Sequence, residues 1–429
     1  MRVAVVGAGP SGVFATAELL TRPGVEVDVL DRSYTPFGLV RYGVAPDHLK
    51  IKTVATALSR VLADERVRFH GGVELGRDLS LDELRSVSDA VVLATGARDS
   101  RRLGIPGEDL PGSFTAADMV PWYNGHPLDG VRWSTASSSV AVVGAGNVAL
   151  DVSRILLKGG AGLANTDLPG SVAAVLDARP VTDVHLVIRR GVADVRFSPA
   201  ELLEFDHLDV DVLVDPTEIT LGSAERARAA EDRLVAQRVA MFTRWAEAGA
   251  VGAGRRLHVH FHRTPTEIGG AAGVEAIALR DNRSGRIEEL SVGAVVTAIG
   301  YRAAAPAGLF TTDGAVHHDA GRVAPGLYVA GWLKRGPSGV IGTNKACAAE
   351  TVRALWADVD SAAITGGADG PADLVRSRLP EVVDWSGWTR IDAAEIALGA
   401  TTGRARTKIT NHAELARLGA AAVLAEETR

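Results

Sequence analysis

The sequence predicts an α/β protein with two parallel sheets covered by helices, because one glycine pattern occurs in it twice. The first copy spans residues 7–12 as Gly-Ala-Gly-Pro-Ser-Gly and follows the apolar run Arg2–Val6. The second spans residues 144–149 as Gly-Ala-Gly-Asn-Val-Ala and follows Ser139–Val143. Such glycines allow a tight turn out of a strand and a close approach of backbone to a pyrophosphate at a helix N-terminus. Two copies predict two Rossmann-like dinucleotide-binding domains.

The charged residues that follow the two patterns differ in sign. Asp31 ends the apolar run Val25–Leu30 after the first pattern, whereas Arg189 and Arg190 end the strand-like run after the second. An acid at this position accepts hydrogen bonds from free ribose hydroxyls, and arginines bind a 2′-phosphate. The sequence therefore predicts one dinucleotide without that phosphate and one with it, for which FAD and NADP(H) are the obvious pair.

Composition limits the remaining possibilities. The 429 residues exceed the roughly 250–300 residues of a single core. One cysteine, Cys347, excludes an intramolecular disulfide and a four-cysteine cluster, and we expect no metal site. A net charge of −6 gives no reason to expect nucleic acid. No apolar run approaches the roughly 20 residues of a membrane span, and the first pattern begins so close to Met1 that we expect no targeting peptide. These observations predict a cytoplasmic location.

The order of the predicted elements suggests that one domain is inserted into the other. The step Ile105-Pro106-Gly107 is the first expected boundary. The run Ala294–Gly300 mirrors Val91–Gly96 and is expected to return the chain to the first domain. We therefore predict a discontinuous FAD domain over residues 1–105 and 298–429, with an NADP domain over residues 106–297.

Three further elements are expected within the inserted domain. Helical periodicity predicts one long helix from Ser223 to Ala248. The runs Arg256–Phe261 and Val274–Arg280 look like an antiparallel excursion. One more element is expected in the returning part of the first domain. Residues 326–343 are expected to form a strand, a glycine-rich turn and the start of a helix, and this helix start would face the flavin.

Several longer motifs resemble adrenodoxin reductase and its bacterial ferredoxin–NADP reductase relatives. They cover residues 36–41, 43–48, 146–152 and 331–341, and the similarity extends over nearly the whole chain. Disulfide reductases end the corresponding flavin motif in Gly-Asp, whereas this chain has Gly331-Trp332. The resemblance implies FAD in the discontinuous domain, NADPH in the inserted one and a one-electron iron–sulfur partner.

The resemblance also implies roles for individual positions. The FAD contacts would be Gly7, Gly9, Gly12, Asp31, Leu39, Thr95, Gly331, Trp332, Gly339, Val340 and Ile341. The NADP contacts would be Gly144, Gly146, Asn147, Val148, Arg189, Arg190 and Glu201. Polar groups near the flavin, suggested as a proton or electrostatic relay, would be His48, Asp151 and Glu204. The chain departs from the family at Leu49, Val192 and Leu203, where two prolines and an arginine are usual.

The predicted reaction is hydride transfer from NADPH to FAD, followed by single-electron transfer to a ferredoxin-type protein. Because ferredoxins are typically acidic, a local basic face is required for docking, and Arg233, Arg238 and Arg244 are candidates. Alternatives remain open at this stage. The chain could be an NADPH-dependent flavin monooxygenase or reductase that acts on a small molecule, or the reductase arm of a larger synthase. His48 could be a structural histidine, and the arginines could be a solvated face.

Overall fold

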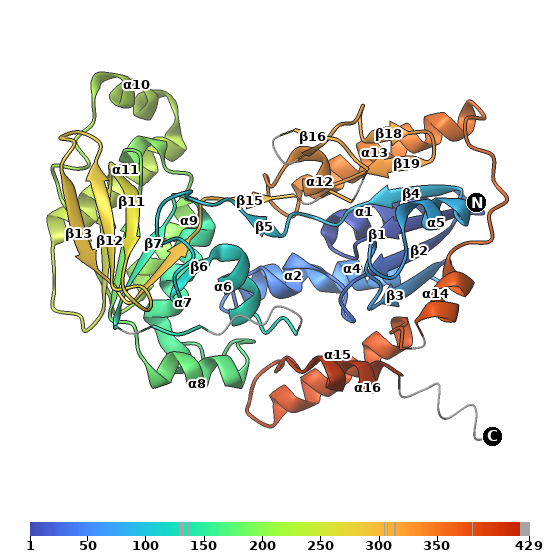
Figure 1. The fold of residues 1–429 in the computed structure, drawn as a ribbon, viewed down its shortest axis with the longest axis horizontal. Coiled ribbons are helices and arrows are strands. Elements are labelled where there is room, and N and C mark those ends of the chain that lie inside the picture. Colours follow the sequence, from blue (N-terminus) through green and yellow to red (C-terminus); the bar gives the residue numbers. More distant parts are fainter. Residues whose placement is uncertain are drawn as a thin grey trace. The chain divides into compact units, whose positions relative to one another are not determined.

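The computed structural model describes residues 1–127, 133–135, 137–303, 305–306, 308–312, 315–379 and 381–420. The chain divides into two compact units (Figure 1). Unit 1 comprises Met1–Asp99, Asn124–Leu128 and Tyr301–Arg429, and unit 2 comprises Ser100–Tyr123 and Asp129–Gly300. Two short strands, β5 (Asp99–Ser100) and β15 (Tyr301–Arg302), lie where the chain crosses between the units. Unit 2 is thus an insertion into unit 1, which agrees with the predicted fold class of one domain inserted into the other.

Unit 1 is built on a sheet of strand order β18-β19-β4-β1-β2-β3. All its neighbours pair in parallel except β18 and β19. The strands are β1 (Arg2–Val6), β2 (Glu26–Asp31), β3 (Val67–Gly71), β4 (Ala90–Leu93), β18 (Arg322–Ala324) and β19 (Leu327–Val329). β16 (Thr311–Thr312) and β17 (Ala315–Val316) pair antiparallel in a separate two-stranded sheet. β1 alternates between two cores: Val3 and Val5 belong to one apolar cluster, Ala4 and Val6 to the other.

Helices cover this sheet, and α1 packs against α13. The helices of unit 1 are α1 (Pro10–Leu19), α2 (Leu39–Tyr42), α3 (Leu49–Lys52), α4 (Val54–Leu62), α5 (Leu81–Ser86), α12 (Trp332–Arg335), α13 (Thr343–Asp360), α14 (Ala372–Arg378), α15 (Trp385–Ala400) and α16 (His412–Ala420). None of the helices in the described part of the chain is long and apolar enough to cross a membrane.

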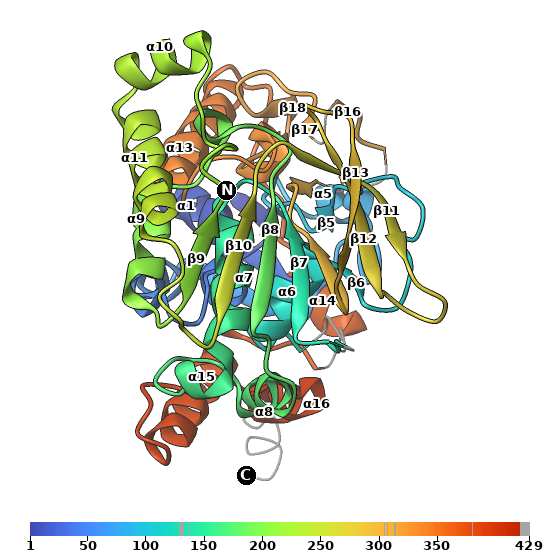
Figure 2. The same cartoon turned by 90° about the vertical axis from the view of Figure 1, so that its left-hand side faces the viewer.

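Unit 2 is built on a fully parallel sheet of order β6-β14-β7-β8-β10-β9, seen face-on in Figure 2. Its strands are β6 (Ser113–Thr115), β7 (Ser139–Val143), β8 (Asp183–Val187), β9 (Asp211–Val214), β10 (Arg256–His260) and β14 (Ala294–Thr297). An antiparallel sheet contains β11 (Arg263–Gly269), β12 (Ala276–Asp281) and β13 (Ile287–Ser291). The helices are α6 (Ala116–Tyr123), α7 (Asn147–Gly162), α8 (Gly170–Ala178), α9 (Pro199–Leu203), α10 (Ser223–Glu231) and α11 (Arg233–Ala248). The predicted α/β class is confirmed.

The structure corrects three of the expected elements. β14 does not return the chain to the first domain, because it pairs with β7 and β6 in the sheet of unit 2. β10 is not part of an antiparallel excursion: it pairs in parallel with β8 and β9. The predicted long helix is two helices, because the side chain of Asp232 caps α11 by accepting hydrogen bonds from the backbone N–H groups of Leu234 and Val235.

Candidate functional site

At two glycines of the first turn a side chain would collide with neighbouring backbone, whereas at the third there is room for one. A Cβ on Gly12 would overlap the carbonyl oxygen of Gly7, and a Cβ on Gly7 would lie 2.5 Å from the carbonyl oxygen of Ala94. A Cβ on Gly9 would meet only the Cα of Gly38, at 3.9 Å. Gly9 is also the N-cap of α1 and offers no capping side chain. The backbone at Gly9 is therefore accessible to an anion, as a pyrophosphate requires.

Asp31 fixes this turn from the end of β2. Its carboxylate accepts hydrogen bonds from the backbone N–H of Ala8 at 2.7 Å and of Ser33 at 2.8 Å. Burial raises the pKa of Asp31, while these two hydrogen bonds act in the opposite direction. The acid that the sequence assigned to a ribose thus has a second task, which is to hold the glycine turn against β2.

The second glycine-rich block of unit 1 is joined to the first pattern. Gly331 has a φ of +69°, and a Cβ there would overlap the Ser11 hydroxyl. Ser11 Oγ donates to Asn344 Oδ1 at 2.9 Å, and Arg335 Nη2 donates to the same oxygen at 2.7 Å. Residues more than 300 positions apart therefore meet at the N-termini of α1 and α13, where the prediction put the two flavin-binding segments.

Around these turns lie groups that suit a flavin. Leu39 and Val340 are apolar yet 39% and 75% exposed. Trp332 is half-buried, with its ring 5.8 Å from that of Tyr301. The hydroxyl of Thr95 is buried and has no hydrogen-bond partner among the described residues. Exposed apolar side chains, an unsatisfied hydroxyl and the open backbone at the α1 N-terminus fit FAD, which has an apolar ring system, a polar edge and a pyrophosphate.

The loop before this site is anchored by the C-terminal part of unit 1. Arg41, in α2, donates to the fully buried carboxylate of Glu395 at 2.5 Å, and Arg406 donates to the same carboxylate at 2.9 Å. Burial alone would raise the pKa of Glu395, but Arg41 and Arg406 hold it below its usual range. The Arg41 guanidinium also lies 5.3 Å from the ring centre of Trp388. The ion pair therefore fixes the segment that carries Leu39.

In the second glycine turn, in unit 2, one glycine likewise has no room for a Cβ and another has room. A Cβ on Gly144 would lie 2.5 Å from the carbonyl oxygen of Ala298, whereas a Cβ on Gly146 would meet nothing within 4 Å. Gly146 is the N-cap of α7 and offers no capping side chain. The side chain of Asn147 is engaged with Ser198: its Oδ1 accepts from the Ser198 backbone N–H at 2.8 Å, and its Nδ2 donates to Ser198 Oγ at 3.4 Å. The open backbone is thus at Gly146, with Val148 following in α7.

Arg189 and Arg190 directly follow β8 and are exposed. Their backbone is held in place, since the carbonyl of Arg189 accepts from Asn282 Nδ2 at 2.8 Å and that of Arg190 accepts from the His262 N–H at 3.2 Å. Their guanidinium groups make no ion pair with any residue in the described ranges. β8 and the glycine turn are adjacent, because the Gly144 N–H donates to the Val187 carbonyl at 3.0 Å. Two unpaired cations therefore stand at the strand end beside the turn.

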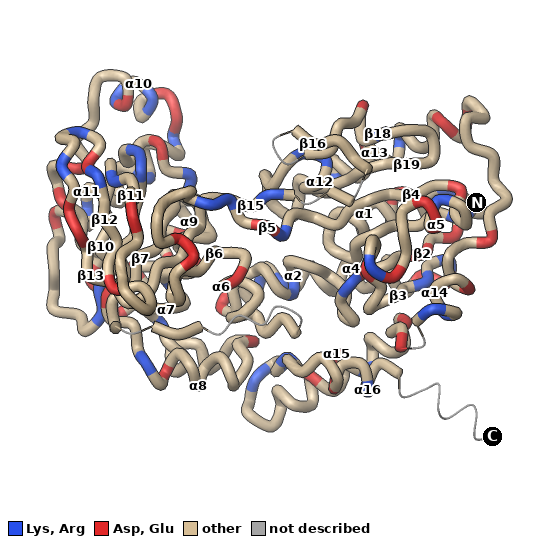
Figure 3. The backbone as a smooth tube through the Cα atoms, in the orientation of Figure 1, with Lys and Arg blue, Asp and Glu red and all other residues tan. Residues whose placement is uncertain are grey.

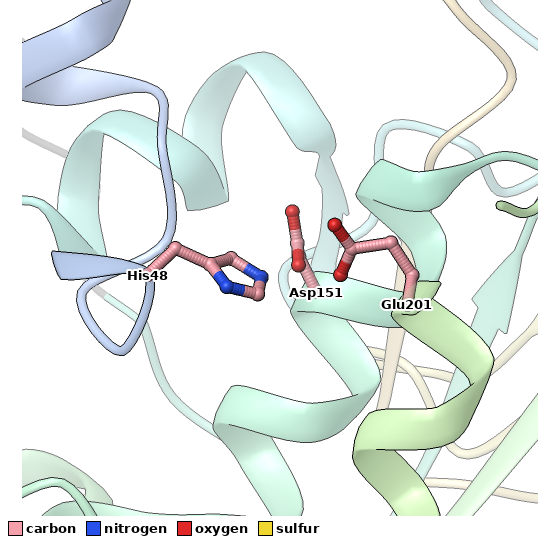
Figure 4. A group of neighbouring side chains, drawn as sticks. All are labelled: His48, Asp151 and Glu201. Atoms are coloured by element: carbon pink, nitrogen blue, oxygen red, sulfur yellow. The ribbon is translucent and has the colours of Figure 1, made fainter. Parts of the chain in front are cut away.

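A buried arginine that sequence reasoning missed connects two of the predicted residues. Arg154, fully buried in α7, donates to Asp151 at 2.7 Å and to Glu201, in α9, at 3.4 Å. Figure 4 shows Asp151 and Glu201 with their carboxylates on facing elements. The i, i+3 spacing of Asp151 and Arg154 in one helix could have predicted their ion pair from the sequence. Glu204, in contrast, begins the 3-10 turn Glu204–His207, is half-buried and forms no ion pair within the described chain.

His48, also labelled in Figure 4, belongs to unit 1. It is half-buried and is the N-cap residue of α3, and its backbone N–H donates to the Ala45 carbonyl at 3.0 Å. Its neighbour Leu49, which stands where the family usually has a proline, is the first residue of that helix. The relay role of His48 remains a prediction.

Comparisons with known proteins agree with this geometry. The family model described as pyridine nucleotide-disulphide oxidoreductase matches residues 1–198. NADPH-ferredoxin reductase FprA of Mycobacterium tuberculosis is 40% identical, over 97% of this chain and 98% of its own. The mitochondrial NADPH:adrenodoxin oxidoreductase of Arabidopsis thaliana is 36% identical, over 97% and 94%. The solved structure of M. tuberculosis FprA in complex with NADPH matches with a TM-score of 0.91, over 97% of this chain and 99% of that one.

The matches to the two relatives and to the solved structure extend over nearly the full length of both chains, so they include both glycine turns and the segment that separates them. They confirm the resemblance that the motifs around Leu39 and Trp332 predicted. The chain therefore belongs to the ferredoxin–NADP reductase family, whose adrenodoxin reductase-like members are oxidoreductases that use FAD and NADP(H).

Proposed function

We propose that this protein oxidises NADPH and reduces a ferredoxin-type iron–sulfur protein, with FAD bound in unit 1 and NADPH in unit 2. One observation carries the proposal: two glycine turns are open to a pyrophosphate, at Gly9 and Gly146, and arginines without an ion-pair partner among the described residues lie beside the second. FAD, when bound, supplies the chemistry by accepting a hydride from NADPH and passing electrons on singly. We also propose a cytoplasmic location, which the single cysteine supports.

The residues of unit 1 would bind and orient the flavin. Backbone N–H groups at the α1 N-terminus, exposed at Gly9, would hold the pyrophosphate. Asp31 would accept a hydrogen bond from the ribose. The second glycine-rich block of unit 1 would contribute the apolar surface of Trp332 and Val340. The Thr95 hydroxyl would form a hydrogen bond with the cofactor. Because Gly331 has no Cβ, its backbone turn can pack directly against the Ser11 hydroxyl.

The residues of unit 2 would select NADPH. Arg189 and Arg190 each present a planar fork of N–H donors that matches phosphate oxygens and stays charged at any working pH. Glu201 is held by Arg154 and would bind the ribose. Because the same arginine also donates to Asp151, we infer that it fixes the orientation of both acids.

We further propose that part of α11 receives the ferredoxin. Arg233 and Arg244 are exposed and lie eleven residues apart, about three helical turns, so they share one face. Arg244 pairs with Asp206 at 2.6 Å but is still 54% exposed. Arg238 contributes less, because it donates to the Phe197 carbonyl at 3.3 Å. Figure 3 shows Lys and Arg interspersed with Asp and Glu over α10 and α11, so the attraction would be local.

The function is tested by offering the flavin-loaded protein different electron acceptors. With NADPH as donor, we expect rapid reduction of a [2Fe–2S] or [4Fe–4S] ferredoxin and slow consumption of oxygen, and a weak reaction with NADH. A stopped-flow measurement of ferredoxin absorbance, run beside an oxygen electrode, gives both rates. Fast oxygen consumption stimulated by a small organic substrate, with no ferredoxin reduction, would instead identify an oxygenase.

A further inference from the structure

The second glycine turn has a neighbour that the family resemblance did not assign. Residues 195–198 run along this turn: the Arg196 N–H donates to the Ala145 carbonyl at 2.8 Å. Two residues later, the Ser198 N–H donates to Asn147 Oδ1 at 2.8 Å. The first bond joins the two backbones directly, and the second joins the backbone of Ser198 to the side chain of Asn147. Arg196 is therefore held against the turn at a fixed position.

Burial alternates along this segment. Val195 and Phe197 are 2% and 0% exposed, whereas Arg196 between them is exposed. Val195 has extended backbone angles, and successive side chains of an extended segment point to opposite sides. The side chain of Arg196 is thus on the side away from the core, while its backbone remains bonded to the turn.

The charge of Arg196 has no partner within the described part of the chain. Its guanidinium makes no ion pair or hydrogen bond with any residue that the structure describes. Two other arginines of unit 2 are engaged, in contrast: Arg228 pairs with Asp194 at 2.8 Å and Arg256 with Asp183 at 2.6 Å. The backbone beside Arg196 is open, since a Cβ on Gly146 would meet nothing within 4 Å. An unpaired cation therefore adjoins an open glycine at a helix N-terminus.

We propose that Arg196 binds the pyrophosphate of NADPH and so positions the dinucleotide on the second glycine turn. This inference rests on the proposed function, because it assumes that unit 2 binds NADPH. Arg196 differs from Arg189 and Arg190 in what it recognises: those two follow β8 and are assigned to the 2′-phosphate, which NADH lacks. Both nicotinamide cofactors contain the pyrophosphate, so Arg196 strengthens the binding of both by the same factor.

The test is calorimetric titration of the FAD-loaded protein with NADP⁺, NAD⁺ and adenosine 2′-monophosphate, which has no pyrophosphate. For Arg196→Gln we expect NADP⁺ and NAD⁺ each to bind about tenfold more weakly, near the lower end for a hydrogen bond to a charged group because the site is exposed. Binding of adenosine 2′-monophosphate should not change. For Arg189→Gln the expected pattern is the opposite, with weaker binding of NADP⁺ and of adenosine 2′-monophosphate but not of NAD⁺.

Two outcomes would overturn the proposal. Unchanged NADP⁺ binding in Arg196→Gln would show that the guanidinium does not contact the cofactor. Loss of NADP⁺ and adenosine 2′-monophosphate binding, with NAD⁺ unaffected, would assign Arg196 to the 2′-phosphate instead. Arg85→Gln, which removes an exposed charge from α5 of unit 1, controls for net charge, and Arg196→Ala serves if the glutamine variant folds poorly. If the wild type binds NADP⁺ but does not reduce ferredoxin, the proposed function fails while the assignment of Arg196 is still decided.

Discussion

Arg41 and Glu395 form a buried ion pair at 2.5 Å across 354 residues of sequence. Arg41 belongs to the segment that carries Leu39, and Glu395 lies in α15. The last third of unit 1 thus holds a loop that the first motif places at the flavin site. Because Glu395 is fully buried, its charge is tolerated only while Arg41 and Arg406 remain beside it.

Breaking this pair should loosen flavin binding as well as the fold. Glu395→Gln leaves the Arg41 charge buried without its counterion, and such changes cost about 3–5 kcal/mol. We expect a lower free energy of unfolding in urea and a reduced FAD content of the purified protein. Asp373→Asn is the matched control, because it removes an exposed pair with Arg376 that is worth about 0–1 kcal/mol. Equal effects of the two variants would contradict this account.

The glycines of the first turn should separate cofactor binding from folding. Gly9 has a φ of −73° and room for a Cβ, so Gly9→Ala should fold normally but retain little FAD, because the methyl group occupies the approach to the pyrophosphate. Gly12→Ala should instead lower the melting temperature, since its Cβ overlaps the Gly7 carbonyl and overpacking costs about 1–3 kcal/mol. Flavin absorbance per polypeptide and thermal unfolding measure both. Full flavin content in Gly9→Ala would argue against a pyrophosphate there.

Cofactor preference should depend on the arginines after β8. A hydrogen bond to a charged group contributes about 1.5–3 kcal/mol, so Arg189→Ala or Arg190→Ala should each lower kcat/KM for NADPH roughly 10- to 150-fold. The value for NADH should change little, because NADH lacks the 2′-phosphate. Steady-state kinetics with both cofactors give the ratio. A wild type that uses NADH as well as NADPH, or a parallel loss with both, would mean that these arginines do not bind the phosphate.

Ferredoxin reduction should depend on salt through α11. Charge reversal at Arg233 and Arg244 should slow ferredoxin reduction about tenfold at low salt, because basic patches act mainly on the encounter rate. The difference in rate between the variant and the wild type should become smaller near 0.15 M salt, because the Debye length is then only about 8 Å. Reduction of ferricyanide, a small acceptor, should be unchanged, and Arg85→Glu is the control for net charge. An equal loss with both acceptors would indicate damage to the enzyme instead of lost docking.

Two histidines of unit 2 should make its stability depend on pH. His185 Nδ1 and His260 Nε2 are 3.0 Å apart on neighbouring strands, and burial lowers their pKa values to about 4 and about 3. Unfolded histidines bind protons near pH 6.5. The unfolded chain therefore binds more protons between about pH 6.5 and 4, and stability falls as the pH is lowered through that range.

Urea titrations at pH 7 and pH 5 measure this dependence. The slope should be at most about 1.4 kcal/mol per pH unit for each histidine. Replacing both His185 and His260 by Gln should flatten it, whereas His207→Gln, on the exposed surface of the same unit, should leave it as in the wild type. An unchanged slope in the double variant would show that these histidines are already protonated in the folded protein at pH 5.

The features that could be predicted from the sequence are those fixed by neighbouring residues. A strand, a glycine turn and a helix follow one another directly at Gly7 and again at Gly144, so pattern and spacing suffice to predict them. The arginines after β8 were found for the same reason. The break between α10 and α11 was also local, since Asp232 is a capping residue, but helical periodicity on both sides concealed it.

Only the tertiary structure decided which distant segments meet. The alternation of His258 and His260 with buried Leu257 and Val259 is typical of an antiparallel edge, yet β10 pairs in parallel with β8 and β9. The partners of Arg154 and Glu395 were likewise hidden, because a buried charge reveals its counterion only once the chain is folded around it. Local sequence determines turns and elements through backbone geometry, whereas strand partners and buried ion pairs depend on how the whole chain removes its apolar surface from water.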